Sequence, residues 1–307
     1  MPKFVKINPK MFYKLNALIL LCFLVLMHNP LHADSLSVNY FTPKNVYSFA
    51  EYLFQEGDYL RAAGEFQRYL YGLGSFPAGA DSVLYKIGLC YQLGKDFAKA
   101  IDYFRRVVDN YPQSTYIARS CYQIAYSYFL MGKYRKSISY LDSVLPLLEL
   151  NHDKLKMQQL IGLNYIYQRQ WKKAYNFLYS LDEDTKNDSL TILLMSFARK
   201  GEHLQHKNKL VAGFLSSVIP GTGKVYCGRS SDGLFSLIVV GLMGWQAYES
   251  FHKDGIHSVK GWIYGTIGGI FYLGNIYGSI VAAKIYNEQQ EDKLLDKVGF
   301  YINVYLR

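Results

Sequence analysis

A pattern of aromatic, small and bulky apolar residues recurs along the chain at intervals of 37 or 38 residues. Each aromatic residue is followed by a small residue three positions later and by a bulky apolar residue six or seven positions later, and another small residue precedes it by nine. Such a set fits two helices joined by a tight turn, because small residues let two backbones approach and large ones fill the gaps between pairs. The aromatic positions are Tyr59, Phe97, Tyr134 and Trp171; the small ones are Ala62, Ala100, Ser137 and Ala174, with Ala50, Gly88, Ala125 and Gly162; the bulky ones are Phe66, Phe104, Leu141 and Phe177.

Glycine and proline mark the expected helix ends. Gly57, Gly94 and Gly132 stand where the first helix of a pair should end, and a left-handed C-cap conformation favours glycine there. Pro112 is expected to stop the second helix of its pair. Residues Ser189 to Lys200 predict a final capping helix. The pattern therefore predicts an all-α solenoid of helical hairpins over residues 43–200.

One unit resembles the tetratricopeptide repeat (TPR) most closely. Its small, aromatic and proline positions match Gly88, Tyr91, Phe97, Ala100, Phe104 and Pro112. The other units match more loosely, and the first ends in a glycine-rich stretch, Tyr71 to Gly79, in place of a proline. The resemblance covers about residues 43–185 and implies a curved stack whose concave face binds protein segments.

The family's concave face comes from the first helix of each pair, and carrying that placement over gives a candidate protein-binding groove. Tyrosine suits such a groove because it buries a large area and keeps a polar tip. The alternative is that several of these aromatic residues only pack between helices. The groove candidates are Tyr47, Phe54, Tyr85, Leu89, Arg119, Tyr122, Tyr126, Phe129, Lys156 and Leu163.

The pattern changes after about residue 208, where charges thin out and glycine becomes frequent. Two apolar runs, 233–251 and 261–283, reach about the length that crosses a bilayer. A short polar link, His252 to Lys260, joins them into an expected transmembrane hairpin. Gly261, Gly265 and Gly269 lie four apart and would permit close helix contact in lipid. The alternative is a glycine-rich soluble helical domain.

A glycine motif precedes this hairpin, formed by Pro220, Gly221, Gly223, Tyr226, Gly228 and Gly233. It resembles the I-P-G-x-G-x-x-Y-x-G-(x)4-G signature of small bacterial membrane domains, similar to the TM2 family, over residues 208–285. The resemblance implies a membrane hairpin with a re-entrant or interfacial segment at 211–228 that turns at Pro220-Gly221. A phosphate-binding loop does not fit, because Val218 and Val225 replace its glycine and its Ser or Thr.

The two ends of the chain carry further signals. Lysines precede an apolar run at 15–27, and Ala33 follows it, which predicts a signal peptide at 1–33 and a linker at 34–42; the alternative is an uncleaved anchor. Export would place the repeats on the periplasmic side, whereas the cationic flanks of the hairpin favour the cytoplasm, so the topology stays open. In the tail, 286–307, apolar residues alternate from Val298 to Leu306, which predicts an ordered tail or a strand added to a partner.

Composition narrows the classes of function. Aromatic residues make up 16% of the chain, which argues against disorder. The net charge is +10, but the cations are scattered, so we predict no nucleic-acid partner. The four cysteines form no C-x-x-C pair, and the seven histidines form no H-E-x-x-H motif; His203 and His206 lack further ligands. We therefore predict no catalytic residues, metal, cofactor or small-molecule substrate.

Together these features predict a non-enzymatic scaffold of the bacterial cell envelope. It would be anchored in a lipid bilayer and bind other envelope or membrane proteins through the concave face of its repeats. One alternative is an assembly factor for outer-membrane or secreted proteins, and another is a small protein associated with a transporter.

Overall fold

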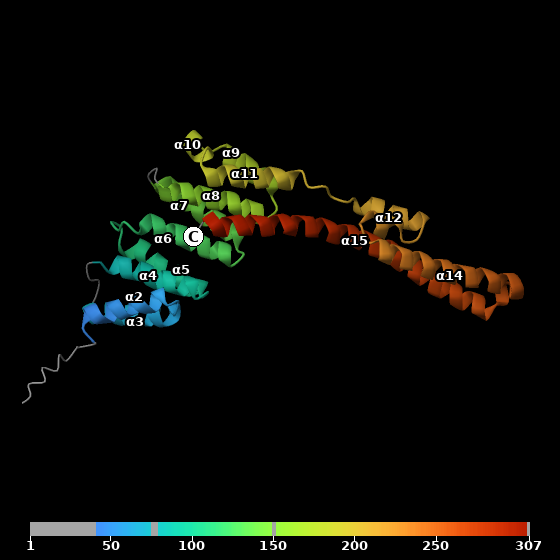
Figure 1. Ribbon diagram of the computed structural model, residues 1–307, viewed down its shortest axis with the longest axis horizontal. Coiled ribbons are helices and arrows are strands. Elements are labelled where there is room, and N and C mark those ends of the chain that lie inside the picture. Colours follow the sequence, from blue (N-terminus) through green and yellow to red (C-terminus); the bar gives the residue numbers. More distant parts are fainter. Residues whose placement is uncertain (1–40, 75–78, 149–151, 306–307) are drawn as a thin grey trace, which may run out of the picture. The chain divides into compact units, whose positions relative to one another are not determined.

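Figure 1 shows the computed structural model, which describes residues 41–74, 79–148 and 152–305. The predicted signal peptide, 1–33, lies outside the described residues. Within them every regular element is a helix, which confirms the predicted all-α class. The chain divides into two compact units, residues 1–80 and 81–307.

The first unit contains one helical hairpin, α2 (Pro43–Gln55) and α3 (Tyr59–Leu73). The Thr42 hydroxyl caps α2 by accepting a hydrogen bond from the Asn45 N–H at 3.3 Å. The predicted small positions Ala50 and Ala62 are fully buried where the two helices cross. The small residues thus allow the close crossing that the repeat pattern predicts.

The second unit begins with three more hairpins. They are α4 (Ala80–Leu93) with α5 (Phe97–Asn110), α6 (Ile117–Leu130) with α7 (Tyr134–Val144), and α8 (His152–Tyr167) with α9 (Trp171–Tyr179). A short 3-10 turn, η1 (Leu145–Leu147), follows α7, and a short α10 (Glu183–Lys186) leads into α11 (Ser189–Glu202), the predicted final helix. Each aromatic residue of the repeat pattern is the first residue of the second helix in its hairpin.

Two details of the predicted register are wrong. The bulky position of the last hairpin belongs to Leu178, which is fully buried, and not to Phe177. A Cβ at Gly162 would lie 2.5 Å from the Leu178 side chain, so the small residue there makes room for the leucine. The left-handed residue that ends α4 is Lys95, with φ +65°, and not Gly94; Arg169 takes the equivalent place after α8.

The rest of the second unit forms a hairpin of long helices with two short helices before it. These are α12 (Lys209–Val218), α13 (Thr222–Tyr226), α14 (Ser230–Asp254), the 3-10 turn η2 (Gly255–His257) and α15 (Val259–Tyr305). The predicted break at Pro220-Gly221 is confirmed, since it separates α12 from α13. The hairpin also forms as predicted, but Gly268, and not Gly269, continues the contact face from Gly261 and Gly265.

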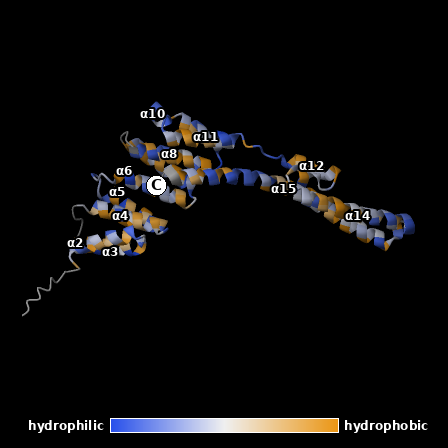
Figure 2. Cartoon of the chain, in the orientation of Figure 1, coloured by the Kyte–Doolittle hydropathy of each residue, from blue (hydrophilic) through white to orange (hydrophobic). Residues whose placement is uncertain are grey.

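Two helical segments, Ser230–His257 and Val259–Ile302, are long and apolar enough to cross a membrane. Only 11% and 28% of their most apolar 18-residue windows is buried, whereas the core helix of a soluble protein would be mostly buried. Figure 2 shows the hydrophobic colour along α14, α12 and the adjoining part of α15. Many large apolar side chains on these helices, such as Phe235 and Leu273, are exposed.

The predicted strand in the tail is wrong. α15 continues without a break from the hairpin to Tyr305, so the segment from Val298 to Tyr305 is helical. Residues 284–293 of α15 are mostly polar, and apolar residues return at Leu294. The C-terminal end of α15 is therefore a second amphipathic segment on the same helix.

Candidate protein-binding groove

The walls of the groove are α6 and α8, the first helices of two successive hairpins, and α11, the final helix of the repeats. A ladder of aromatic rings runs along α6: Tyr122 stacks on Tyr126 at 5.8 Å between ring centroids, and Tyr126 stacks on Phe129 at 5.9 Å. Phe129 in turn meets the edge of Tyr167 on α8 at 5.0 Å. Spacings of three and four residues place the α6 rings on one face of the helix.

Hydrogen bonds fix α11 against α8. Asp188 caps α11 by accepting from the backbone N–H groups of Leu190 and Thr191. The buried amide of Gln159 on α8 donates to the Asp188 carboxylate at 2.7 Å and to the Thr191 hydroxyl at 3.2 Å. A polar side chain within the groove thus holds its third wall in place.

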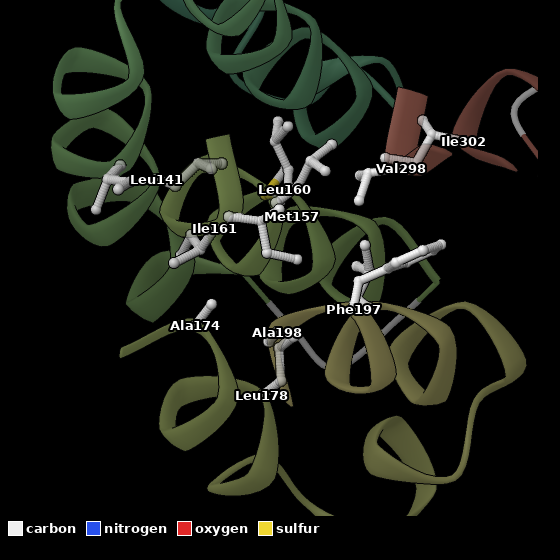
Figure 3. Packing of buried hydrophobic residues seen from close by; sticks show 14 of the residues in the cluster. Leu141, Met157, Leu160, Ile161, Ala174, Leu178, Phe197, Ala198, Val298 and Ile302 are labelled. Atoms are coloured by element: carbon white, nitrogen blue, oxygen red, sulfur yellow. The ribbon is translucent and has the colours of Figure 1, made fainter. Parts of the chain in front are cut away.

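The groove is filled by the C-terminal end of α15. Leu294, Val298 and Ile302 lie four residues apart on one helix face and are 8%, 0% and 8% exposed. They belong to the same core cluster as Leu160 on α8 and Phe197 on α11. Figure 3 shows Val298 and Ile302 beside these side chains.

Little space remains around the docked helix. The cavity that Ile302 helps to line has a volume of about 30 Å³. That volume holds one or two water molecules but no side chain of a partner. Its other lining residues come from all three wall helices: Tyr122, Tyr126, Lys156, Gln159, Leu160, Leu163, Leu190 and Leu194.

Ion pairs flank the docked segment on its N-terminal side. Arg169 lies 3.1 Å from the Glu291 carboxylate and 2.6 Å from that of Asp292, and His206 lies 3.2 Å from Glu291. Asp292 is 58% exposed in its side chain, and such pairs contribute about 0.2–1 kcal/mol each. Each buried apolar anchor contributes about 1.5–3 kcal/mol. The buried anchors therefore contribute most of the docking free energy.

Burial also shapes the acid–base chemistry of the groove. Desolvation raises the pKa of the Tyr122 and Tyr126 phenols above their ordinary values. The pKa of Tyr167 is raised by burial first and then by the neighbouring Tyr134, Tyr126 and Asp296. These tyrosines stay neutral at physiological pH, so the groove is an apolar surface with hydrogen-bonding tips.

The structure gathers only part of the predicted groove set around the docked helix. Tyr122, Tyr126, Lys156 and Leu163 line the remaining cavity, and Phe129 extends the aromatic ladder. The other predicted residues, Tyr85, Leu89, Arg119, Tyr47 and Phe54, pack elsewhere.

Tyr85 packs against Phe104 and Tyr116, and Leu89 packs against the core of the α4–α5 hairpin. The Arg119 guanidinium lies 6.0 Å from the Tyr116 ring centroid. In the first unit Tyr47 packs on Phe66 and Tyr69, and Phe54 packs on Tyr59. These aromatic residues contact rings of neighbouring elements, and their place in a protein-binding surface stays a prediction.

The occupant of the groove was not predicted from the sequence. The period-two alternation predicts a strand, whereas the four-residue spacing of Leu294, Val298 and Ile302 also fits one face of a helix. That spacing, read together with the acidic pair Glu291-Asp292, was the available signal for a docked helix.

The glycine motif forms a second close-packed site, between α12, α13, α14 and α15. Gly221 has φ +91° and donates its N–H to the Asn275 Oδ1 at 3.1 Å. A Cβ at Gly221 would overlap the carbonyl oxygen of Gly233. Both the left-handed backbone and the close approach therefore require glycine at position 221.

Buried hydroxyl groups complete this second site. The Gly223 N–H donates to the Ser216 Oγ at 2.9 Å, and Ser216 and Ser279 are hydrogen-bonded at 2.7 Å. The Tyr226 hydroxyl accepts from the Asn208 N–H at 3.3 Å. Pro220 lies in the break between α12 and α13, and Gly228, at φ +79°, lies in the turn between α13 and α14. The motif residues thus build the junction from which the long hairpin emerges.

Family models for the tetratricopeptide repeat match residues 82–114 and 118–145. The predicted repeats are therefore confirmed for these two hairpins, and tetratricopeptide repeats imply a protein–protein interaction scaffold. No curated protein matches the chain. Two solved structures, one of them a point variant of the other, are of a Podosopora anserina protein assigned as a kinesin light chain with nearly identical TPR-like repeats. Each is 14% identical to this chain, with a TM-score of 0.41. The match covers 52% of this chain and 85% or 88% of the chain in the solved structure.

Proposed function

We propose that this chain is a membrane-anchored, non-enzymatic scaffold of the bacterial cell envelope whose tetratricopeptide repeats bind another envelope or membrane protein. α14 and the first part of α15 form the anchor. The groove between α6, α8 and α11 is the protein-binding site. The observation that carries the proposal is the groove itself, because it already holds a helical segment through buried apolar contacts.

Exposed apolar surface supports the membrane anchor. Phe214, Phe235 and Leu273 are each at least 66% exposed, on α12, α14 and α15 respectively. A soluble protein rarely exposes so many large apolar side chains together. Lipid would cover them, and the resemblance of the glycine motif to small bacterial membrane domains implies the same arrangement.

The polar groups beneath that apolar surface are satisfied, as lipid requires. Ser216, Ser279 and Asn275 are at most 4% exposed, and each has a hydrogen-bond partner. Small and polar residues that pair across helices are typical of helix packing in a bilayer. This network supports a packed membrane domain in which α12 lies against α15.

The length of α15 connects the two functions. Its 47 residues span about 70 Å at 1.5 Å per residue. The first half of the helix pairs with α14, and the last turns lie in the groove. A partner bound at the groove would therefore be held at a defined distance from the membrane.

The predicted export signal places the repeats on the periplasmic side in this proposal. A reporter enzyme that is active only outside the cytoplasm, fused after Arg307, should then be active in intact cells. Activity of a cytoplasm-dependent reporter at the same position would reverse the orientation without removing the anchor.

The decisive test of the proposed function combines fractionation with crosslinking. The full chain should sediment with membranes, resist extraction by high salt and alkaline carbonate, and dissolve in detergent. A photo-crosslinking residue in place of Tyr126 should then trap a protein partner, and Tyr122→Ala should weaken that capture. Tyr179→Ala is the matched control, because Tyr179 is exposed on α9 and does not line the groove cavity.

Recovery of the chain in the soluble fraction without detergent would refute the anchor. Equal capture by the Tyr122→Ala and Tyr179→Ala variants would refute the groove as the binding site.

A further inference from the structure

A segment of the same chain already occupies the repeat groove. The end of α15 buries Leu294, Val298 and Ile302 against α6, α8 and α11, in the place where a partner segment would lie. Gly299, on the same segment, lies so close to α8 that a Cβ there would be 3.2 Å from the Tyr167 hydroxyl. No room remains in the groove for a second segment.

We propose that the end of α15 is a resident ligand and that the partner of this groove is a helix of the same chemistry. Such a helix carries branched apolar residues at positions i, i+4 and i+8, as Leu294, Val298 and Ile302 do. Acidic residues stand two and three positions before the first of them, as Asp292 and Glu291 do. The partner helix binds by displacing the end of α15. The inference rests on the proposed function, because it specifies the partner of the same groove.

The apolar spacing follows from the shape of the groove. The resident segment places its three anchors along one face of an α-helix, while Phe300 on the opposite side is 67% exposed. Tyr301, beside the anchors, packs on Phe197 of α11 at 5.7 Å between ring centroids. The segment that fills these three positions is helical up to Tyr305. The groove therefore selects a helix that buries one narrow apolar face.

The acidic positions follow from the charges beside the groove. Arg169 stands at the turn after α8 and pairs with both acidic residues of the resident segment. His206, in the linker before α12, contacts the same glutamate at 3.2 Å. A partner helix with this acidic pair forms the same ion pairs with the Arg169 guanidinium. A basic residue at either acidic position would be repelled by Arg169.

Displacement needs no unfolding of the repeats. The walls of the groove are held by their own contacts, such as the hydrogen bonds of Gln159 to Asp188 and Thr191, and none of these involves α15. The resident segment lies at the C-terminal end of its helix and is tied to the walls mainly by side-chain packing. Removal of its anchors therefore opens the groove and leaves the wall-to-wall hydrogen bonds intact.

The test uses the full chain in detergent and a fluorescent synthetic peptide with the sequence of residues 286–307 as the probe. Val298→Asp with Ile302→Asp opens the groove, since two charges cannot remain in this buried site. The opened chain should bind the probe at least tenfold more tightly than the unaltered chain does. A control probe that carries the same two substitutions should bind to neither chain.

A second probe tests the acidic positions. Replacement of Glu291 and Asp292 in the peptide by lysine should weaken binding to the opened chain, and Arg169→Glu in the opened chain should restore it. Helix content measured by circular dichroism shows whether the opened chain is folded. If it is not, Val298→Ala with Ile302→Ala loosens the segment without introducing charge and takes its place.

Failure of a folded, opened chain to bind the probe overturns the inference, and so does equal binding by the opened and unaltered chains. Neither result contradicts the membrane anchor or the capture of a partner by crosslinking. Solubility without detergent overturns the proposed function and does not depend on the probe.

Discussion

Loss of two of the three buried α15 anchors should open the repeat groove by a calculable amount. Val298→Ala removes two carbons and Ile302→Ala removes three, from side chains that are 0% and 8% exposed. At about 0.8 kcal/mol per buried carbon the double variant loses about 4 kcal/mol of docking free energy. Since about 1.4 kcal/mol corresponds to a factor of ten, the undocked population should rise roughly a thousandfold.

A thiol placed on the groove wall measures this population. Leu163 lines the cavity and is 5% exposed, so a cysteine at this position reacts with a thiol reagent only when α15 leaves. Cys90, Cys121 and Cys227 are buried, and the rate of the parent chain without the added cysteine is subtracted. The labelling rate at position 163 should rise with the undocked population until the groove is open most of the time.

The matched control for this prediction is Phe300→Ala. Phe300 lies on the same turns of α15 but is 67% exposed, so its loss should change the docking free energy by less than about 0.5 kcal/mol. The labelling rate should then stay within about threefold of the starting value. If the double alanine variant labels no faster than the Phe300→Ala variant, the buried anchors do not hold α15 in the groove.

Three further predictions follow from the same contacts. Glu291→Gln with Asp292→Asn should raise the labelling rate at position 163 less than the double alanine variant does, because ion pairs contribute less than buried anchors; an equal or larger rise would make charge the main docking force. Gly221→Ala should lower the melting temperature in detergent more than Gly228→Ala does, since both have positive φ but only the first adds an overlap; equal losses would contradict the close packing. Burial raises the pKa of Tyr122, so the neutral phenol favours the folded state. This contribution to stability is fully present below about pH 10, the pKa of an exposed tyrosine, and is lost as pH rises through the higher pKa of the folded state. Tyrosinate absorbance, compared with that of the Tyr122→Phe variant, should therefore show that Tyr122 ionises above the pH at which an exposed tyrosine does. Ionisation at about pH 10 would mean that the groove is open.

The repeat pattern of the sequence determined the helical hairpins closely. Tyr59, Phe97, Tyr134 and Trp171 mark the first residues of the second helices because they recur at one fixed place in each pair. Helix boundaries and crossings depend on residues that are near in sequence, so a local pattern records them. The same holds for the break at Pro220-Gly221.

Finer choices within the hairpins depended on contacts across them. Phe177 and Leu178 are adjacent and both apolar, and only the crossing at Gly162 selects Leu178 as the buried one. Lys95 adopts the left-handed conformation next to a glycine that does not, because the chain must turn at that place to start α5. A glycine in the sequence indicates where such a turn is easy, but the path of the next helix decides where it occurs.

Only the tertiary structure decided that the C-terminal segment is a helix and that it occupies the groove. Val298 and Ile302 are four residues apart, and that spacing puts them on one face both of a strand and of a helix. The surfaces that bury them belong to α6, α8 and α11, of which the last ends at Glu202, far earlier in the chain. The sequence by itself determined that an apolar face exists there. The fold decided that this face is helical and buried, because the surfaces that cover it come together only when the repeats stack.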